Sequence, residues 1–228
     1  MPSTKKELAG YIDHTLLSAT AVESDIRAHC EQAVSYGFYS VCVLGRWVSL
    51  AADILAGTGV KVDAVAGFPF GADTRGVKVA DAEAMIKAGA DEIDMVADLA
   101  SVIGGDRRYL AGEFDSMLKV CRSMRPAIVL KVIIESAALT VEQIRFVCGV
   151  ASEAGVGFLK TSTGLHPAGG ARIEDVRLMA VSAPKCRVKA AGGIKTACEA
   201  IAMIEAGASR IGTSRSVAIV DGFDAEGA

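Results

Sequence analysis

The sequence predicts a TIM barrel, an α/β fold in which eight parallel strands form a closed ring and each strand is followed by a helix. Eight short β-rich runs can be counted along the 228 residues, with helical patterns between them. A barrel of this kind typically takes about 250 residues. Hydrophobic residues make up 51% of the chain and aromatic residues only 5%. Packing by Ala, Val, Ile and Gly suits parallel strands that are buried on both faces.

A unit of one form also recurs along the chain. It reads "IKAGADEIDMV" at 86–96, "SEAGVGFLKTS" at 152–162 and "IEAGASRIGTS" at 204–214, with a looser copy, "AVSYGFYSVCV", at 33–43. Glycine at the end of a helical pattern is the expected cap in left-handed geometry. Each copy therefore indicates a helix, a glycine stop and a strand, and the repetition implies βα units in series.

The predicted elements follow one another in order. The strands are expected at 11–17, 40–45, 61–69, 92–98, 128–135, 157–163, 187–193 and 209–214. Apolar residues at three- and four-residue spacing predict helices most clearly at 22–37, 74–89 and 140–155, with another at 196–207. Thr140, followed by Glu142 and Gln143, marks a helix start. No linker or low-complexity tract divides the chain, so we expect a single domain over residues 1–228.

The alternative fold is a doubly wound open sheet. Such a sheet usually has fewer strands, and its first βα turn often carries a GxGxxG fingerprint. The turn after the first predicted strand reads "LLSATAVES", which lacks those glycines. The barrel is therefore the preferred prediction.

Composition excludes several classes of function. Net charge is −3 with both signs interspersed, so nothing indicates a nucleic-acid or membrane-surface partner. No apolar run reaches membrane-spanning length, and the N-terminus lacks the apolar core of a signal peptide. The six cysteines form no CxxC pair, and no histidine cluster has zinc-site spacing. We expect a reduced, cytoplasmic protein with free thiols and no metal, in which Cys42 is a small core residue rather than a nucleophile.

Three lysines lie inside apolar runs that predict buried strands. Lys131, Lys160 and Lys189 fall in predicted strands five, six and seven, and Asp13 and Asp94 are polar residues of strands one and four. A buried ammonium group is costly unless it is paired or used. In a TIM barrel the chemistry lies at the C-terminal ends of the strands, and side chains alternate inward and outward. The five polar residues are therefore read as a set, and the three lysines, on neighbouring strands, are expected to come together inside the barrel.

Such a group of lysines indicates a particular chemistry. Neighbouring ammonium groups disfavour one another's charged forms and burial acts in the same direction, so the lysine pKa values are expected to fall. A neutral amine attacks carbonyl carbons, and a lysine with a cationic neighbour is a known route to a Schiff base. Asp94 could offset part of the charge and relay protons. The alternative is that the lysines only form buried ion pairs with Asp94 or Glu135.

Two glycine-rich turns follow the last two predicted strands, "AAGGIKT" after strand seven and "RIGTSRS" after strand eight. The loops after these strands, with an adjoining helix N-terminus, form the common phosphate site of TIM barrels. Glycine lets backbone N–H groups approach an anion closely. The residues therefore predict a Schiff-base enzyme that acts on a phosphorylated carbonyl compound.

At these residues the sequence resembles the deoxyribose-phosphate aldolases, a family of class I aldolases. The resemblance covers nearly the whole chain and is carried by "IDHTLL" (12–17), "SVCV" (40–43), "GFPFGADTRGVKVADAEAMIKAGADEIDMV" (67–96), "LKVIIE" (130–135), "FLKTSTG" (158–164), "VKAAGGIKT" (188–196) and "RIGTS" (210–214). It implies a TIM barrel that reversibly cleaves 2-deoxyribose 5-phosphate to acetaldehyde and glyceraldehyde 3-phosphate in deoxyribose phosphate catabolism. It also implies a sugar-phosphate as the small-molecule partner and no metal or other cofactor. A homo-oligomer, dimer or tetramer, is compatible with the sequence.

The resemblance also implies roles for individual residues. Lys160 stands where the family has its Schiff-base lysine, and Lys189 matches the second lysine, which lowers the pKa of the first and helps proton transfer. Asp94 matches the relay aspartate, and Lys131 matches a supporting lysine near it. The family's phosphate site corresponds to Gly164, Gly192, Gly193, Gly212 and Ser214.

The chain departs from the family pattern at a few positions. Arg215 and Ser216 follow "GTS", where small residues are usual, and Ala97 and Asp98 follow "DMV". The chain ends soon after "VDGFDAEGA", without an aromatic tail. We expect the Arg215 side chain to point outward, onto the first turn of the last helix.

Two other functions remain open beside the aldolase. One is a barrel lyase or isomerase with another phosphorylated substrate, which the Arg215 region motivates. The other is a non-catalytic sugar-phosphate sensor, although binding alone does not need a neutral lysine. His14 and His166 could indicate other acid–base chemistry. We expect instead that His14 forms a hydrogen bond near the end of the first strand and that His166 lies in a loop.

Overall fold

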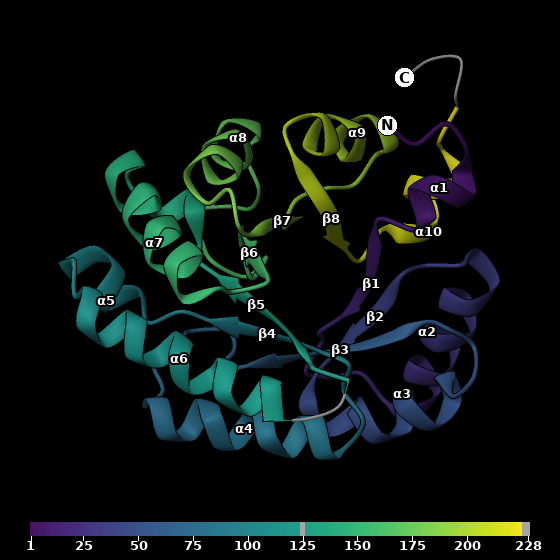
Figure 1. The fold of residues 1–228 in the computed structure, drawn as a ribbon. Coiled ribbons are helices and arrows are strands. Elements are labelled where there is room, and N and C mark those ends of the chain that lie inside the picture. Colours follow the sequence, from purple (N-terminus) through teal and green to yellow (C-terminus); the bar gives the residue numbers. More distant parts are fainter. Residues whose placement is uncertain (124–125, 225–228) are drawn as a thin grey trace.

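Eight parallel strands close into a barrel in sequence order. The computed structural model describes residues 1–123 and 126–224. Each strand pairs with the next one along the chain, and β8 pairs back with β1. The helices lie around this ring (Figure 1). The predicted TIM barrel is confirmed, and the doubly wound alternative is wrong.

The strands are β1 Ile12–Leu16, β2 Ser40–Val43, β3 Lys61–Ala66, β4 Glu92–Val96, β5 Val129–Ile133, β6 Phe158–Lys160, β7 Arg187–Ala191 and β8 Ala208–Thr213. The α-helices are α1 Lys5–Ala9, α2 Glu23–Tyr36, α3 Val48–Leu55, α4 Arg75–Lys87, α5 Leu99–Gly104, α6 Arg107–Ser123, α7 Val141–Ala154, α8 Ile173–Ser182, α9 Ala197–Glu205 and α10 Ser216–Asp221. Two short 3₁₀ turns, η1 Gly45–Trp47 and η2 Ser136–Ala138, follow β2 and β5. Every predicted strand is present, and most end a few residues earlier than predicted.

The helix signals in the sequence correspond to real caps. Thr140 begins α7 with a capping box, because its side chain accepts from the Gln143 N–H and the Gln143 side chain accepts from the Thr140 N–H. Thr196 and Glu199 form the same arrangement at α9. Gly37 and Gly155 end α2 and α7 with φ values of 69° and 80°, the left-handed geometry that glycine adopts without a Cβ clash.

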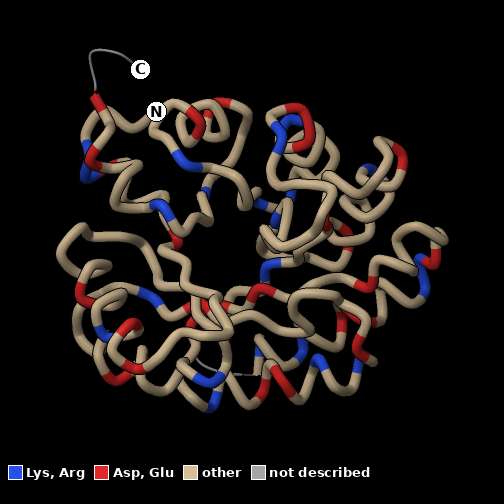
Figure 2. Tube along the Cα trace, turned by 180° about the vertical axis from the view of Figure 1, so that it is seen from behind, with Lys and Arg blue, Asp and Glu red and all other residues tan. Residues whose placement is uncertain are grey.

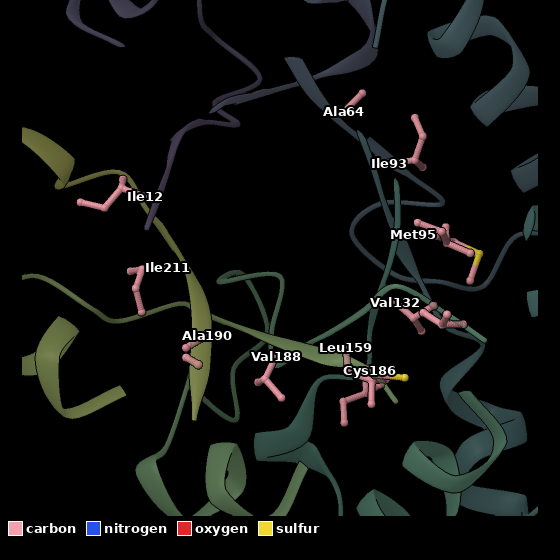
Figure 3. Packing of buried hydrophobic residues seen from close by; sticks show 14 of the residues in the cluster. Ile12, Ala64, Ile93, Met95, Val132, Leu159, Cys186, Val188, Ala190 and Ile211 are labelled. Carbon is pink, nitrogen blue, oxygen red and sulfur yellow. The ribbon is translucent and has the colours of Figure 1, made fainter. Parts of the chain in front are cut away.

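Side chains along each strand alternate between two environments. Ile12, Ile93 and Leu159 point out of the ring and join the hydrophobic core beneath the helices (Figure 3). The next residue along each of these strands, Asp13, Asp94 or Lys160, is buried and charged. Because a strand has a period of two, the apolar outer face of each strand places its charged residues inside the barrel.

A buried ion pair outside the barrel holds α4 against α6. Lys78 Nζ lies 2.6 Å from a Glu113 carboxylate oxygen and donates to the Val96 carbonyl at 2.9 Å. The second Glu113 oxygen accepts from the Asp98 N–H, and the Asp98 side chain caps α5 through the Ser101 N–H. Asp98, one of the departures from the family pattern, therefore has a structural role in helix capping.

The first and last helices lie side by side where the barrel closes (Figure 1). Lys5 Nζ, in α1, donates to the Asp221 carbonyl at the end of α10, at 2.7 Å. The predicted single domain finishes with a short tail that includes residues 225–228. These four residues lie outside the described part of the chain.

Charged residues of both signs are interspersed over the outer helices (Figure 2). Among the helices of the described residues, none is long and apolar enough to cross a membrane.

Candidate active site

The three lysines of the predicted site meet around one carboxylate. Asp94 Oδ1 accepts a hydrogen bond from Lys131 Nζ at 2.7 Å. Asp94 Oδ2 accepts from Lys160 Nζ at 2.7 Å and from Lys189 Nζ at 2.8 Å. All four side chains are buried. The register explains the grouping, because Asp94 pairs with Lys131 across β4 and β5, and Lys160 pairs with Lys189 across β6 and β7.

Further charges complete the interior of the barrel. Lys131 Nζ also lies 2.9 Å from Asp63 and 2.7 Å from Glu92. Lys189 Nζ lies 2.5 Å from Asp13 and 2.9 Å from Asp63. Lys131 and Lys189 therefore each contact three carboxylates, whereas Lys160 contacts only Asp94 among the ion pairs of the described residues.

The two signs of charge come from different halves of the chain. The carboxylates Asp13, Asp63, Glu92 and Asp94 lie on β1, β3 and β4, and the cations Lys131, Lys160, Lys189 and Arg210 lie on β5 to β8. Arg210 binds Asp13 at 2.5 Å and lies 3.4 Å from Glu92, and its guanidinium stacks on the Tyr39 ring. We call these eight residues the charge cluster.

The expected fall of the lysine pKa values is wrong for two of the three lysines. Burial by itself lowers the pKa of Lys189, but the charges of Asp13, Asp63 and Asp94 outweigh it and raise the pKa well above its usual range. The pKa of Lys131 is likewise raised, because Asp63, Asp94 and Glu92 outweigh burial and the Lys189 charge. The prediction took account of Asp94 but not of Asp13, Asp63 and Glu92, which also face these lysines.

The same contacts shift the pKa values of the carboxylates. Burial would raise the pKa of Asp94, but the ammonium groups of Lys131, Lys160 and Lys189 hold that pKa well below its usual range. Asp94 is therefore ionised when the site is empty. Burial and the neighbouring Asp94 charge raise the pKa of Asp63 to about 6, against the opposite effect of its lysine partners.

A cavity of about 380 Å³ opens above the charge cluster, at the C-terminal ends of the strands. Lys160 lies in its wall, together with Thr15 of β1 and the loops after β6, β7 and β8. Its described lining holds three cationic residues, Lys160, Lys195 and Arg215, and no carboxylate. Such a cavity attracts an anionic ligand and places a lysine nitrogen within its reach.

The five predicted phosphate residues, Gly164, Gly192, Gly193, Gly212 and Ser214, all line this cavity. The first three have φ values between 81° and 87°, which favour glycine. At Gly212 a Cβ would lie 3.1 Å from Lys189 Cε, so a side chain there would crowd the second lysine. The N–H groups of Lys195 and Thr196 donate to Glu199 in the α9 cap, so these two donors of the expected helix N-terminus are already paired.

Glu135 has a role different from the one expected. It does not pair with the site lysines; instead its carboxylate accepts the N–H of Thr163 and, at 2.9 Å, the Thr163 hydroxyl. Glu135 is buried with a positive φ of 51°. Thr163 Oγ1 in turn accepts from the Leu165 N–H at 3.1 Å. Glu135 therefore fixes the loop that carries Gly164.

Arg215 and Ser216 begin the last short helix. The Arg215 N–H donates to Thr213 Oγ1 at 3.0 Å, and Arg215 is exposed at the cavity rim. Ser216 is buried, and its hydroxyl donates to the Thr213 carbonyl at 3.0 Å. Arg215 thus contributes to the cavity wall, while Ser216 stabilises the turn before the helix through its hydrogen bond.

The histidines lie away from the charge cluster. His14 Nε2 and Gln32 Oε1 are 3.3 Å apart in a hydrogen bond, and the His14 ring stacks on His29 with centroids 3.6 Å apart. His166 lies in the loop after β6, where its Nδ1 accepts from the Ala168 N–H. Both placements agree with the sequence predictions.

Within the described residues, two groups of ligand atoms lie close enough together to be considered for a metal. They are Cys42 with Asp63 and Asp94, and Asp13 with Asp63 and Glu92. Lysine or arginine nitrogens already contact every carboxylate of both groups. Cys42 is buried, and burial followed by the Asp63 charge raises the pKa of its thiol well above the usual value, as expected of a core residue rather than a nucleophile.

Sequence reasoning missed three members of the charge cluster and one cationic residue of the cavity lining. Asp63, Glu92 and Arg210 were not singled out, although each is a charged residue of a predicted strand. Glu92 stands two residues before Asp94 and therefore on the same face of β4. Lys195, in "GGIKT", could have been found as the cation beside the predicted phosphate loop.

Comparison with known proteins places these features in a family. A family model described as DeoC/LacD family aldolase matches residues 8–220. A deoxyribose-phosphate aldolase of Aciduliprofundum boonei is 46% identical over 217 residues, which are 95% of this chain and 96% of that protein. The corresponding enzyme of Deinococcus radiodurans is 48% identical over 219 residues, 94% of this chain and 96% of that protein.

The solved structures agree with the sequence relatives. The structure described as the unique tetrameric structure of deoxyribose phosphate aldolase from Aeropyrum pernix superposes with a TM-score of 0.90 at 31% identity. The superposition covers 96% of this chain and 92% of that one.

Proposed function

The chain belongs to the DeoC/LacD family of aldolases and is therefore a lyase, and on this premise we propose that it cleaves 2-deoxyribose 5-phosphate through a Schiff base on Lys160. The products are acetaldehyde and glyceraldehyde 3-phosphate, and the reaction is reversible. This activity serves the breakdown of deoxyribose phosphate. A non-catalytic sensor is set aside by the family assignment.

One observation carries the choice of Lys160. Of the three lysines in the charge cluster, it is the one that lines the cavity, and it has a single carboxylate partner. The other two are each held by three carboxylates. Attack on a carbonyl carbon requires a free amine, and Lys160 is the one of these three lysines that lines the cavity in which the substrate would lie.

The geometry supports a sequence of covalent steps. Lys160 Nζ attacks the aldehyde carbon of the open-chain sugar and, after loss of water, forms a protonated imine. The imine accepts the electron pair of the C2–C3 bond when the 3-hydroxyl loses its proton and that bond breaks. Glyceraldehyde 3-phosphate leaves, the remaining enamine takes up a proton at C2, and water releases acetaldehyde and restores the lysine.

Asp94 and Lys189 are placed to handle the protons of these steps. Asp94 Oδ2 is shared by Lys160 and Lys189 at 2.7 and 2.8 Å. Each change of charge at Lys160 alters the basicity of this oxygen, so it can pass a proton between the substrate adduct and Lys189. Lys131 holds the other oxygen and keeps the Asp94 carboxylate oriented.

We assign the phosphate to the glycine-rich loops that line the cavity. We infer that the backbone around Gly164, Gly192, Gly193, Gly212 and Ser214 binds it, with Lys195 supplying positive charge. This leaves the aldehyde end of the substrate facing Lys160.

Trapping the covalent intermediate tests the proposal directly. The protein is incubated with acetaldehyde and borohydride, and peptide mass spectrometry locates the added ethyl group. We expect it on Lys160, and Lys160→Arg should abolish both adduct and activity with the fold intact. Modification of Lys131 or Lys189 in its place would overturn the assignment.

A second candidate function follows from Arg215 at the cavity rim. An additional cation could let the enzyme accept other phosphorylated aldehydes or sugars. An aldolase assay with 2-deoxyribose 5-phosphate and a panel of other sugar phosphates decides between the two, since a higher kcat/KM for another member identifies the alternative.

We propose a single aldolase domain over residues 1–228, a cytoplasmic location and function without metal or cofactor. The free thiols of the described cysteines support the location. An oligomer, dimer or tetramer, is suggested by the tetrameric Aeropyrum pernix relative.

A further inference from the structure

Asp63 lies inside the charge cluster but has not been assigned a role. It is fully buried on β3. Its Oδ2 accepts a hydrogen bond from Lys189 Nζ at 2.9 Å. Its Oδ1 lies 2.9 Å from Lys131 Nζ, although this contact lacks hydrogen-bond geometry and Oδ1 accepts no hydrogen bond within the described residues. One carboxylate therefore spans the two lysines that do not line the cavity.

The contacts of Asp63 differ from those of Asp94. Asp94 touches all three lysines, whereas the ion pairs of Asp63 in the described residues are with Lys131 and Lys189 only. Without Asp63, Lys131 and Lys189 would each retain two carboxylate partners. The difference in the number of carboxylate partners between these lysines and Lys160 would then be smaller.

We propose that Asp63 is a positioning residue: it holds Lys131 and Lys189 in place as ammonium ions and sets the charge balance against which Lys160 loses its proton. The proposal rests on the function proposed above, in which Lys160 must become a free amine. Asp63 touches neither the cavity nor the reacting atoms, so it acts through the two lysines.

Charge counting gives the direction of the effect. The charge cluster holds four carboxylates and four cations, so it is neutral while Lys160 carries its proton. If position 63 has no charge, the cluster carries one positive charge until Lys160 loses a proton. Deprotonation of Lys160 then relieves repulsion, and the amine forms at a lower pH.

The groups around Asp63 come from several strands. It faces Lys131 on β5, Lys189 on β7, Asp94 on β4, Asp13 on β1 and the Cys42 thiol on β2. Since burial and the Asp94 charge raise the pKa of Asp63 to about 6, the carboxylate is ionised at neutral pH. Its charge therefore contributes above about pH 6, which is the larger part of the range assayed below.

The test compares Asp63→Asn with the unaltered chain across pH. The rate of reductive trapping by acetaldehyde and cyanoborohydride on Lys160, and kcat/KM for 2-deoxyribose 5-phosphate, are measured between pH 5 and 9. We expect the acid limb of both profiles to move to lower pH by about one unit. We also expect kcat to fall roughly tenfold, because an amide can accept from only one of the two ammonium groups.

Two further variants make the result decisive. Asp63→Ala removes the charge without adding an amide, and the acid limb must again move to lower pH. If the Asn variant does not fold, the same measurements on the Ala variant replace it. Glu113→Gln removes a carboxylate from the buried pair with Lys78, outside the barrel. It should lower stability without moving either profile.

The outcomes separate this inference from the function on which it rests. An acid limb that stays in place or moves to higher pH, with Lys160 still trapped, overturns the role of Asp63 and leaves the aldolase mechanism standing. If the unaltered chain gives no adduct on Lys160, the proposed function itself fails.

Discussion

Three residues of one type differ in chemistry here because their neighbours differ. Lys131 and Lys189 end among three carboxylates each, whereas Lys160 meets one carboxylate and the cavity. Nucleophilicity of an amine requires loss of its proton, and that loss is easiest where anionic partners are fewest. On the proposed mechanism, the side chain in the least paired position is the one that reacts.

The first prediction at this scale concerns Asp94→Asn. Asparagine is nearly isosteric but cannot take up a proton as a carboxylate does, so kcat should fall on the order of 10²-fold or more. KM should change much less, because Asp94 is not in the cavity wall. Steady-state kinetics on the folded variant measures both quantities. Turnover near that of the unaltered chain would remove Asp94 from proton transfer.

The second concerns Arg215→Ala. The side chain is exposed at the rim, and backbone donors in the predicted phosphate loops survive the substitution. KM for 2-deoxyribose 5-phosphate should therefore rise less than about threefold, under roughly 1 kcal/mol. Kinetics at low and high salt provides the measurement. A rise of tenfold or more that weakens with salt would show that the Arg215 guanidinium holds the phosphate.

The sequence predicted the site residues better than their charge states. Lysines inside apolar strands are visible without a structure, because burial of charge is unusual. The direction of a pKa shift depends on which side chains face each other across the barrel, and this requires the register. Asp63 and Glu92 supply two of the carboxylates that the prediction left out. Their places in "KVDAVAG" and "DEIDMV" point into the barrel, and this is recognised only once the inward face of each strand is known.

At the scale of elements, the strands carry the charge cluster and the loops after them line most of the cavity. The sequence indicated both because a period of two and a run of glycines are local patterns. Strand ends were less predictable. The run 61–69 was expected to be extended throughout, but β3 stops at Ala66 because Gly67 adopts a φ of 58°. Turn geometry of this kind depends on packing against Lys78, whose side chain lies where a Cβ of Gly67 would project.

Gly192→Ala tests the glycine loops. A Cβ at this position, with a φ of 87°, would lie 3.0 Å from Gly170 Cα and 3.2 Å from Gly164 Cα. The loops after β6 and β7 would have to move apart, so KM for the phosphorylated substrate should rise about tenfold, on the order of 1 kcal/mol. Enzyme kinetics and an inorganic-phosphate inhibition assay measure the change.

Gly57→Ala is the matched control for this substitution. Its φ of 76° imposes comparable backbone strain, but a Cβ there meets no described atom within 4 Å, and the position is remote from the cavity. It should lower stability while leaving KM as it was. Equal KM values in both alanine variants would contradict close packing of the loops as the cause.

At the scale of the whole molecule, stability should fall in mild acid through the stacked histidines between β1 and α2. Burial lowers the pKa of His29 to about 4, and burial together with the His29 charge lowers that of His14 to about 3. Unfolded histidines take up protons near pH 6.5, whereas the folded ones do not. The stabilisation is present above pH 6.5 and is lost as pH falls towards 4, amounting to up to about 3 kcal/mol for His29.

Urea unfolding of the unaltered chain and of His29→Gln at pH 7, 6, 5 and 4 measures this contribution. The variant should show the shallower loss of unfolding free energy, because one buried titrating group is gone. Parallel losses in the two proteins would mean that the histidines do not govern the acid sensitivity and that other groups do.

The order of the charges along the chain has a consequence for synthesis. A ribosome releases the N-terminal half first, so all four carboxylates of the charge cluster leave the exit tunnel before any of their cationic partners. The first partner, Lys131, arrives with β5, and the last, Arg210, arrives with β8. Until Arg210 has been synthesised, the nascent charge cluster holds more carboxylates than cations. Burying the unpaired carboxylates is unfavourable. Electrostatics thus opposes early closure of a partial barrel and favours closure when translation is nearly complete.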